Sequence, residues 1–180
     1  MRPLFTIGHS TRTTADFIAL LRASDIDFVV DVRTVPRSRT NPQFNRDTLP
    51  DSLSNVQIAY EHIAELGGLR GKQRSVEGSP NGFWSNTSFR NYADYALTQP
   101  FHVGLERLRT IMLERRCAIM CAEAVWWRCH RRIIADYLLI GAEPVFHILG
   151  SKHVDPAVLT AGARPGPDGA VFYPAASEDS

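Results

Sequence analysis

The sequence predicts a single α/β domain with a mostly parallel sheet of about five strands and helices on both faces, a Rossmann-like three-layer sandwich. Short apolar runs alternate along the chain with longer segments whose apolar residues recur at helical spacing. A strand, a helix and a second strand fall within residues 4–32, the pattern of a βαβ unit with parallel strands. The length of 180 residues suits one domain that buries a sizeable core.

The first half of the chain contains three predicted strands. Leu4–Ile7 is a short apolar run, and Thr13 with Asp16 forms a helix-start signal ahead of apolar residues at helical spacing. The apolar run Phe28–Val30 predicts the second strand, and Gln57–His62 predicts the third. The first two strands are therefore expected to be parallel.

The second half alternates helices and strands. Apolar positions at helical spacing predict helices at Thr87–Leu97 and Phe101–Arg116. A strand is expected at Cys117–Cys121, a helix at Arg128–Ile140 and a further strand at Val145–Leu149.

Three segments lack a regular pattern. Residues 34–50 contain three prolines and are expected to be irregular. Residues 67–82 open with adjacent glycines and are expected to form a mobile loop. Residues 1–150 form the predicted α/β domain, and residues 151–180 form a Pro-, Gly- and Ala-rich C-terminal extension, partly ordered against it, with Val171–Tyr173 as a candidate edge strand.

Composition and cysteine count restrict the class of protein. A net charge of +1 provides no global attraction to nucleic acid or to a membrane surface. Three cysteines cannot all pair within the chain, and no apolar stretch approaches the ~18 residues of a membrane span. We therefore expect a cytoplasmic protein with no membrane partner, whose thiols are free, catalytic or metal-bound and do not form structural disulfides.

Polar residues follow four of the predicted strands. They are His9 and Ser10, Asp31 and Arg33, His62, and Cys121 with Glu123. In open α/β sheets, ligands bind beyond the carboxyl ends of the strands, near a switch in strand order. The sequence therefore predicts one site at this edge of the sheet.

Several motifs in this chain occur together in a recognisable order. They are Thr6–Ser10, Asp31–Arg33, Ser38–Arg39, Phe44, Tyr60–His62, Leu66–Gly68, Cys121–Glu123 and Cys129–Arg131. As a set, over about residues 4–149, they resemble the bacterial proteins grouped as domain-of-unknown-function family 488. The resemblance implies a cytoplasmic α/β domain and no established reaction. Val125-Trp126-Trp127 stands where members of that family often carry a proline-containing turn.

The segment from Cys121 to Arg132 combines thiols, a carboxylate, an imidazole, tryptophans and arginines. Buried charges and thiols need partners, so we interpret this segment as one wall of the site. Cys121 is expected at the end of a strand, and Cys129 in the first turn of a helix beside Arg128 and Arg131, where a thiol pKa would fall. Either cysteine is therefore a candidate nucleophile or persulfide carrier. Core packing is the alternative for either thiol, and the expected role of Cys117.

Zinc or iron binding is a minor alternative, and no cofactor is predicted. The suitable ligand types are Cys121, Cys129, His130, His9 and His62. No CxxC is present, and the deaminase element that Cys121–Glu123 partly matches lacks its downstream Pro-Cys-x-x-Cys. A cysteine phosphatase loop is disfavoured because six residues, none of them glycine, separate Cys121 from Arg128. A rhodanese is disfavoured as well, since the compact Cys-headed loop is absent.

Basic and aromatic residues predict a site for an anion. The basic clusters are Arg33, Arg37, Arg39 and Arg46; Arg70, Lys72 and Arg74; and Arg128, Arg131 and Arg132. Guanidinium groups bind phosphate or carboxylate through paired donors, and bases stack on exposed rings such as Trp84. The alternative is a solvated surface with local partners, in which Arg33 holds Asp31.

We favour an enzyme acting on a nucleotide or nucleic-acid component, a hydrolase or transferase of a phosphate- or glycosyl-bearing substrate. The candidate catalytic residues are His9, Asp31, Cys121, Glu123 and His130. The candidate substrate-binding residues are Ser10, Arg33, Arg39, Phe44, Tyr60, His62, Trp84, Arg128 and Arg131. The expected partner is an anionic small molecule or a single-stranded nucleic acid. The alternatives are a non-catalytic nucleic-acid-binding module and a thiol- or metal-dependent protein centred on Cys121, Cys129 and His130.

Overall fold

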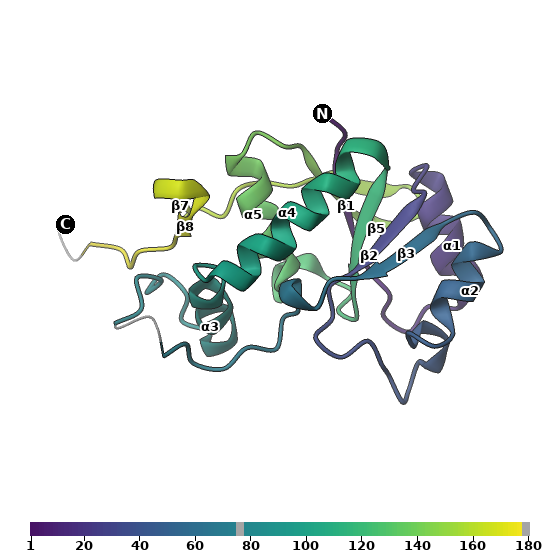
Figure 1. Cartoon of the computed structure of the whole chain (residues 1–180), viewed down its shortest axis with the longest axis horizontal. Coiled ribbons are helices and arrows are strands. Elements are labelled where there is room, and N and C mark those ends of the chain that lie inside the picture. The colour runs from purple at the N-terminus through teal and green to yellow at the C-terminus, as the bar shows by residue number, and fades with distance from the viewer. Residues whose placement is uncertain (75–77, 178–180) are drawn as a thin grey trace.

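A computed structural model describes residues 1–74 and 78–177 and contains a six-stranded sheet with helices on both faces (Figure 1). The strands are β1 (Leu4–Gly8), β2 (Phe28–Asp31), β3 (Ala59–His62), β4 (Cys117–Cys121), β5 (Val145–Gly150) and β6 (His153–Pro156). The helices are α1 (Thr14–Ala23), α2 (Leu49–Ser54), α3 (Thr87–Tyr95), α4 (Gln99–Glu114) and α5 (Arg131–Ile140). The predicted α/β class and the mostly parallel sheet are confirmed.

The strand order is β3-β2-β4-β1-β5-β6, and every pairing except that of β5 with β6 is parallel. The strands β1 and β2 are parallel, as predicted, but β4 lies between them. Every residue of β1 and β4 is buried, as is typical of central strands covered on both faces. The carboxyl ends of β1 to β4 consequently meet at one edge of the sheet.

The sheet separates two hydrophobic cores. The helices α1 and α2 pack on one face, around residues such as Phe17 and Leu53, while α3, α4 and α5 cover the other, around residues such as Phe101 and Ile134 (Figure 1). The start of α1 agrees with its predicted signal, because the Thr13 side chain accepts a hydrogen bond from the Asp16 amide. Apolar burial on both faces fixes the strand ends that carry the polar residues.

Two predictions were wrong about where a helix begins. The helix α5 begins at Arg131, not at Arg128, because a separate 3-10 turn, η3 (Trp126–Arg128), precedes it. Cys129 therefore lies between two helical segments and not in a first helical turn. Part of the segment expected to be irregular begins α2, which buries Leu49 and Leu53 under the sheet.

The C-terminal segment contributes to the sheet. The strand β6 pairs antiparallel with β5 at the edge, a position that the sequence had suggested for residues 171–173. Residues of that stretch instead form β8 (Val171–Phe172), paired with β7 (Arg164–Pro165) in a separate two-stranded sheet. Tyr173 is buried and donates a hydrogen bond to Asp136 of α5.

Of the loop predicted at residues 67–82, residues 75–77 lie outside the described part. In the described part, Arg70 lies over the ring of Tyr95 and donates hydrogen bonds to the carbonyls of Ala64 and Gly67. Within the described ranges, no helix is long and apolar enough to cross a membrane.

Gly8 lets the segments after β1 and β4 lie against each other. A Cβ atom at Gly8 would lie 1.8 Å from the carbonyl oxygen of Glu123. Beyond Gly8 the two segments continue to pair, as the amides of His9 and Ser10 donate to the carbonyls of Cys121 and Ala122. The absence of a side chain here positions the segment that carries Cys121.

We expect Gly8→Ala to lower the free energy of unfolding by about 1–3 kcal/mol, because backbone atoms must move to admit the methyl group. Urea denaturation would measure the loss. Gly71→Ala is the matched control, since no atom lies within 4 Å of a Cβ built there, and its effect should stay within about 0.5 kcal/mol. Equal effects of the two substitutions would contradict this role for Gly8.

Candidate functional site

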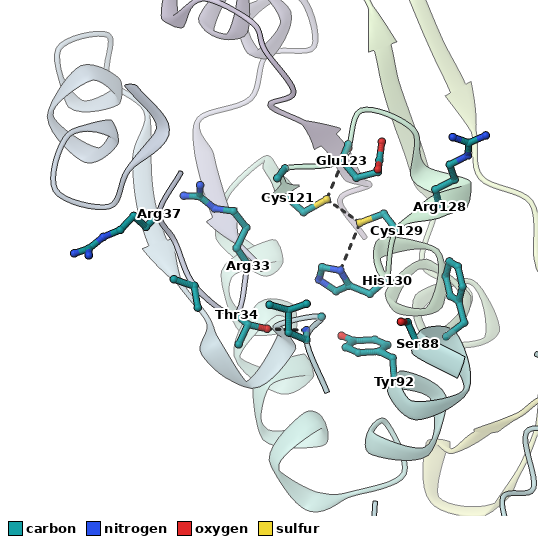
Figure 2. A pocket seen from close by; sticks show the side chains of 15 residues that line it. Arg33, Thr34, Arg37, Ser88, Tyr92, Cys121, Glu123, Arg128, Cys129 and His130 are labelled. Carbon is teal, nitrogen blue, oxygen red and sulfur yellow. Dashed lines mark hydrogen bonds between the residues drawn. The ribbon is translucent and has the colours of Figure 1, made fainter. Parts of the chain in front are cut away.

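A cavity of about 340 Å³ opens at the edge where β2 and β4 end (Figure 2). Its lining comprises Arg33–Val35 and Arg37 after β2, Cys121–Glu123 after β4, Arg128–His130 before α5, Gly68 and Leu69, and Ser88, Phe89 and Tyr92 of α3. The cavity therefore lies at the sheet edge that the polar strand ends predict, with α3 forming one wall.

Two thiols lie in contact at the cavity wall. The Sγ atoms of Cys121 and Cys129 are 2.7 Å apart, and the two residues are 3% and 5% exposed, respectively. Cys121 is the last residue of β4, and the 3-10 turn η3 returns the chain so that Cys129 faces it. Cys117, at the other end of β4, is buried in the core.

His130 faces the Cys129 thiol with one ring nitrogen. Its Nε2 donates a 2.7 Å hydrogen bond to the Val32 carbonyl, so in the neutral ring the unprotonated Nδ1 faces the Cys129 Sγ, 3.5 Å away. Gly68 permits this orientation, because a Cβ there would lie 2.4 Å from Nδ1. The His130 imidazole is thus fixed in a position to exchange a proton with Cys129.

Arg131 is buried, at 1% exposure, without a carboxylate partner among the described residues. Its guanidinium donates to the Glu123 carbonyl at 2.6 Å, to the Cys129 Sγ at 3.3 Å and to the Thr6 hydroxyl at 3.4 Å. A buried cation is costly unless a negative charge lies nearby. Of these three contacts, only the thiol can ionise.

The two thiols share one proton in an asymmetric way. Burial raises the pKa of Cys121 well above its usual range, and its hydrogen bond to Cys129 acts in the same direction. For Cys129, burial is opposed by the hydrogen bond from Cys121, by the positive charge that His130 carries once its Nδ1 has taken up a proton, and by the charge of Arg131. Together these bring the pKa of Cys129 well below the usual range. The preferred state is therefore a Cys129 thiolate that accepts a hydrogen bond from the Cys121 thiol.

Asp31 and Arg33 form a closed ion pair next to the cavity. The buried Asp31 carboxylate accepts hydrogen bonds from the Arg33 amide, from two nitrogens of its guanidinium and from the Tyr60 hydroxyl. Arg33 also donates to the Phe44 carbonyl, at 2.6 Å. Asp31 is not part of the cavity lining, and its acceptor positions are occupied.

His9 belongs to this same network. Its Nδ1 donates to the Ser10 carbonyl, its Nε2 faces Arg33 at 3.4 Å, and its ring stacks on Phe44. Burial lowers the pKa of His9, and the positive charge of Arg33 also lowers it. A neutral imidazole that is stacked and hydrogen-bonded at both nitrogens is suited to hold the loops after β1 and β2 together.

The structure gathers some of the predicted site residues at the cavity and leaves others outside it. At the cavity lie Arg33, Cys121, Glu123, Arg128, Cys129 and His130. His62 bonds the Arg33 carbonyl instead, and Arg39 is exposed in the loop after β2. Trp84, at 5% exposure, packs against Phe89 and beneath Arg132. No group of three or more His, Cys, Asp or Glu side chains in the described ranges is arranged to hold a metal ion.

Sequence analysis did not identify the residues that position the Arg131 guanidinium on the side away from the cavity. The Thr6 hydroxyl that Arg131 contacts lies 2.7 Å from Nδ1 of His147, whose ring stacks on Trp126 with centroids 4.4 Å apart. Burial lowers the pKa of His147 to about 4, and the charge of Arg131 acts in the same direction. A histidine within an apolar strand resembles a packing residue in sequence, so no signal marked this role.

A protein-family model described as "Domain of unknown function DUF488" matches residues 13–138. No curated protein and no solved structure matches the chain.

We expect Asp31→Asn to destabilise the fold by about 3–5 kcal/mol, because it leaves the buried Arg33 guanidinium without its counter-ion. Tyr60→Phe, which removes one hydrogen bond to the same carboxylate, should cost about 1 kcal/mol. Urea denaturation of both variants measures the difference. A cost for Asp31→Asn no greater than that for Tyr60→Phe would show that the ion pair is not a structural anchor.

His147 should make stability fall as the pH is lowered. In the unfolded chain His147 binds a proton below about pH 6.5, but in the folded protein it binds one only below about pH 4. Each pKa unit corresponds to about 1.4 kcal/mol, so His147 accounts for a loss of about 3 kcal/mol across this window. His9 acts in the same direction, so His147→Asn should reduce the pH dependence without abolishing it. An unchanged dependence in urea denaturation at several pH values would refute the assignment.

Proposed function

This chain belongs to the family described as domain of unknown function DUF488, and on that premise we propose that it is an enzyme whose nucleophile is the Cys129 thiolate. The substrate is an anionic small molecule, of the size of a nucleotide component or smaller, that enters the cavity between α3 and the segment before α5. A thiolate nucleophile supports group transfer through a covalent intermediate on sulfur.

The observation that carries the proposal is the buried Arg131 guanidinium. It contacts a hydroxyl, a carbonyl and the Cys129 thiol, of which the thiol alone can supply a negative charge. Ionisation of Cys129 therefore offsets a charge that would otherwise be buried without compensation. A cysteine that served only for packing would leave Arg131 unbalanced.

His130 supports the nucleophile in this proposal. Because Nε2 is bonded to the Val32 carbonyl, Nδ1 faces the thiol and can take a proton from it or return one to a leaving group. The ring also packs edge-on against Tyr92, which limits its rotation. Thiol, base and orienting contact follow the general arrangement of an activated cysteine.

The mouth of the cavity favours an anion. Arg37 and Arg128 lie on opposite sides of it, and their side chains extend outward (Figure 2). Neither side chain forms a hydrogen bond or an ion pair with a described residue. Among the described residues that line the cavity, Glu123 is the one carboxylate, so the arginines leave this part of the mouth positive.

The geometry supports fewer catalytic residues and fewer classes of substrate than the sequence did. Asp31 and His9 are proposed as positioning residues, because their hydrogen-bonding groups are already engaged. Nucleic acid is not proposed as the substrate, because Trp84, expected to stack on a base, is buried among other side chains. The three free cysteines support the proposal of a cytoplasmic location, where thiols stay reduced.

We predict that one thiol, Cys129, is alkylated at neutral pH, and that its rate changes little between about pH 7 and about pH 9, where an ordinary thiol gains most of its reactivity. Cys117, whose pKa is raised to about 12 by burial and by the charge of Asp27, should stay unmodified. Peptide mass spectrometry after timed treatment with iodoacetamide measures both rates. Alkylation of Cys121 ahead of Cys129, or a rate that rises with pH as for a free thiol, would contradict the proposal.

The anion preference is tested by the charge of the reagent. The rate at which Cys129 reacts with iodoacetate, relative to its rate with iodoacetamide, should rise several-fold at low salt. This rise should be smaller in Arg37→Gln/Arg128→Gln. Because both reagents react with the same thiolate, a change in the amount or reactivity of that thiolate affects both rates equally and leaves their ratio unchanged. The same ratio in the variant as in the wild type would remove the arginines from substrate binding.

A further inference from the structure

The proposed function assigns no role to the second thiol, and the following inference rests on that function. We propose that the site catalyses thiol–disulfide exchange on small anionic disulfides, with Cys129 as the attacking thiol and Cys121 as the thiol that resolves the mixed disulfide. The substrate is thereby a molecule with a disulfide bond and carboxylate or other anionic groups near it.

The contact between the two thiols carries this inference. Their Sγ atoms lie 2.7 Å apart, on β4 and on the short segment between η3 and α5, both within the packed part of the molecule (Figure 2). Any sulfur adduct formed on Cys129 would therefore lie against the Cys121 thiol. An intramolecular thiol at contact has a large effective concentration, so displacement of the adduct by Cys121 is favoured over slow hydrolysis.

The exchange proceeds in two balanced steps. The Cys129 thiolate attacks one sulfur of the substrate disulfide, forms a mixed disulfide and releases the first thiolate, which takes up the proton that His130 had accepted from Cys129. The Cys121 sulfur then attacks the Cys129 sulfur, breaks the mixed disulfide and expels the second thiolate, which takes up the proton that Cys121 gives up. The substrate disulfide gains two electrons and two protons, and the dithiol of the protein becomes a disulfide.

Arg131 serves both steps without moving. Its pKa is raised, against burial, by the negative charge of Cys121 as well as that of Cys129, so the guanidinium stabilises a thiolate on either sulfur. When Cys129 is consumed in the mixed disulfide, its sulfur carries no charge. Cys121 stays protonated at rest, and Arg131 then lowers the cost of the transient thiolate that Cys121 forms as it attacks.

The shape of the cavity suits such a substrate. Apolar groups of Val35, Leu69 and Phe89 line it, and Arg37 and Arg128 flank its mouth. A disulfide is an apolar group, and its anionic substituents would reach the arginines while sulfur reaches Cys129. Hydrolysis of the sulfur adduct would require water to reach it. Displacement of the adduct by the neighbouring Cys121 thiol requires no water.

The cycle needs a reductant of the dithiol class to restore Cys121 and Cys129. Stabilisation of the thiolate by Arg131 and His130 favours the reduced pair, which makes the protein disulfide readily reducible by such a dithiol. The reaction that supplies the substrate must be one that oxidises small anionic thiols, since the products are those thiols.

The test uses the full chain with Cys117→Ala, so that the exchange pair alone carries thiols, and dithiobis(nitrobenzoate) as the anionic disulfide. At one equivalent, the reference protein should rapidly release two nitrothiobenzoate ions per molecule and lose two hydrogens in intact mass. Cys121→Ser should release one and retain a nitrothiobenzoate adduct on Cys129. Cys129→Ser should react at least tenfold more slowly, because the thiol it retains is protonated and buried.

The outcomes separate this inference from the proposed function. No rapid release from the reference protein would overturn the Cys129 nucleophile itself. One ion released with the adduct retained in the reference protein, or two released from Cys121→Ser, would overturn the role of Cys121 and leave the nucleophile intact. For the substrate class, Arg37→Gln/Arg128→Gln should slow the anionic probe more than neutral dithiodipyridine, and equal slowing would overturn it.

Discussion

The buried guanidinium of Arg131 is the constraint on which the site depends. It ties three elements together, since it contacts Thr6 on β1, the carbonyl of Glu123 after β4 and the thiol that precedes α5. Its hydrogen bonds fix the turn between Cys121 and Cys129, and its charge has no carboxylate to balance it among the described residues. The position of α5 and the ionisation of a thiol are thus two consequences of one buried charge.

The neighbouring Asp31–Arg33 pair shows the opposite arrangement. There each charge is neutralised by the other, and Tyr60 and Phe44 complete the hydrogen bonds. Such a closed network holds the ends of β2 and β3 in place and offers little to a ligand. The two arginines lie at the same sheet edge, but of the two only Arg131 contacts a thiol, which the proposed function makes the reactive group. At this edge of the sheet, we therefore assign a structural role to the Asp31–Arg33 pair and a chemical role to Arg131 and Cys129.

Much of this arrangement could be predicted from the sequence. Apolar runs and helical spacing located β1, β2, β4 and β5, and parallel strands require that the polar residues after them share an edge. Residues 121–123 and 128–130 of the Cys121–Arg132 segment, interpreted from the sequence as one wall of a site, line the cavity. The strand β6 was missed because an exposed edge strand need not be apolar, and the start of α5 was misplaced because η3 has a similar local composition.

Other features depend on contacts that sequence spacing does not encode. Asp31 ends β2 and Glu123 follows β4, yet Asp31 is buried in an ion pair and Glu123 is exposed at the cavity. The sequence predicts that Trp84 stacks on a base, but its neighbours in space are Phe89 and Arg132. The sequence also leaves packing, metal binding and chemistry open for the thiols, because nothing local reveals that Arg131 has no carboxylate partner within residues 1–74 and 78–177.

The most direct test of this account is the ultraviolet absorbance of thiolate at neutral pH, compared between the wild type and Cys129→Ser. The account predicts about one thiolate per molecule, which is lost in Cys129→Ser and shifted to higher pH in Arg131→Met. Arg132→Met, a change of the adjacent arginine whose guanidinium lies over the Trp84 ring, should retain it. Equal absorbance in the wild type and Cys129→Ser would contradict the claim that a thiolate balances Arg131.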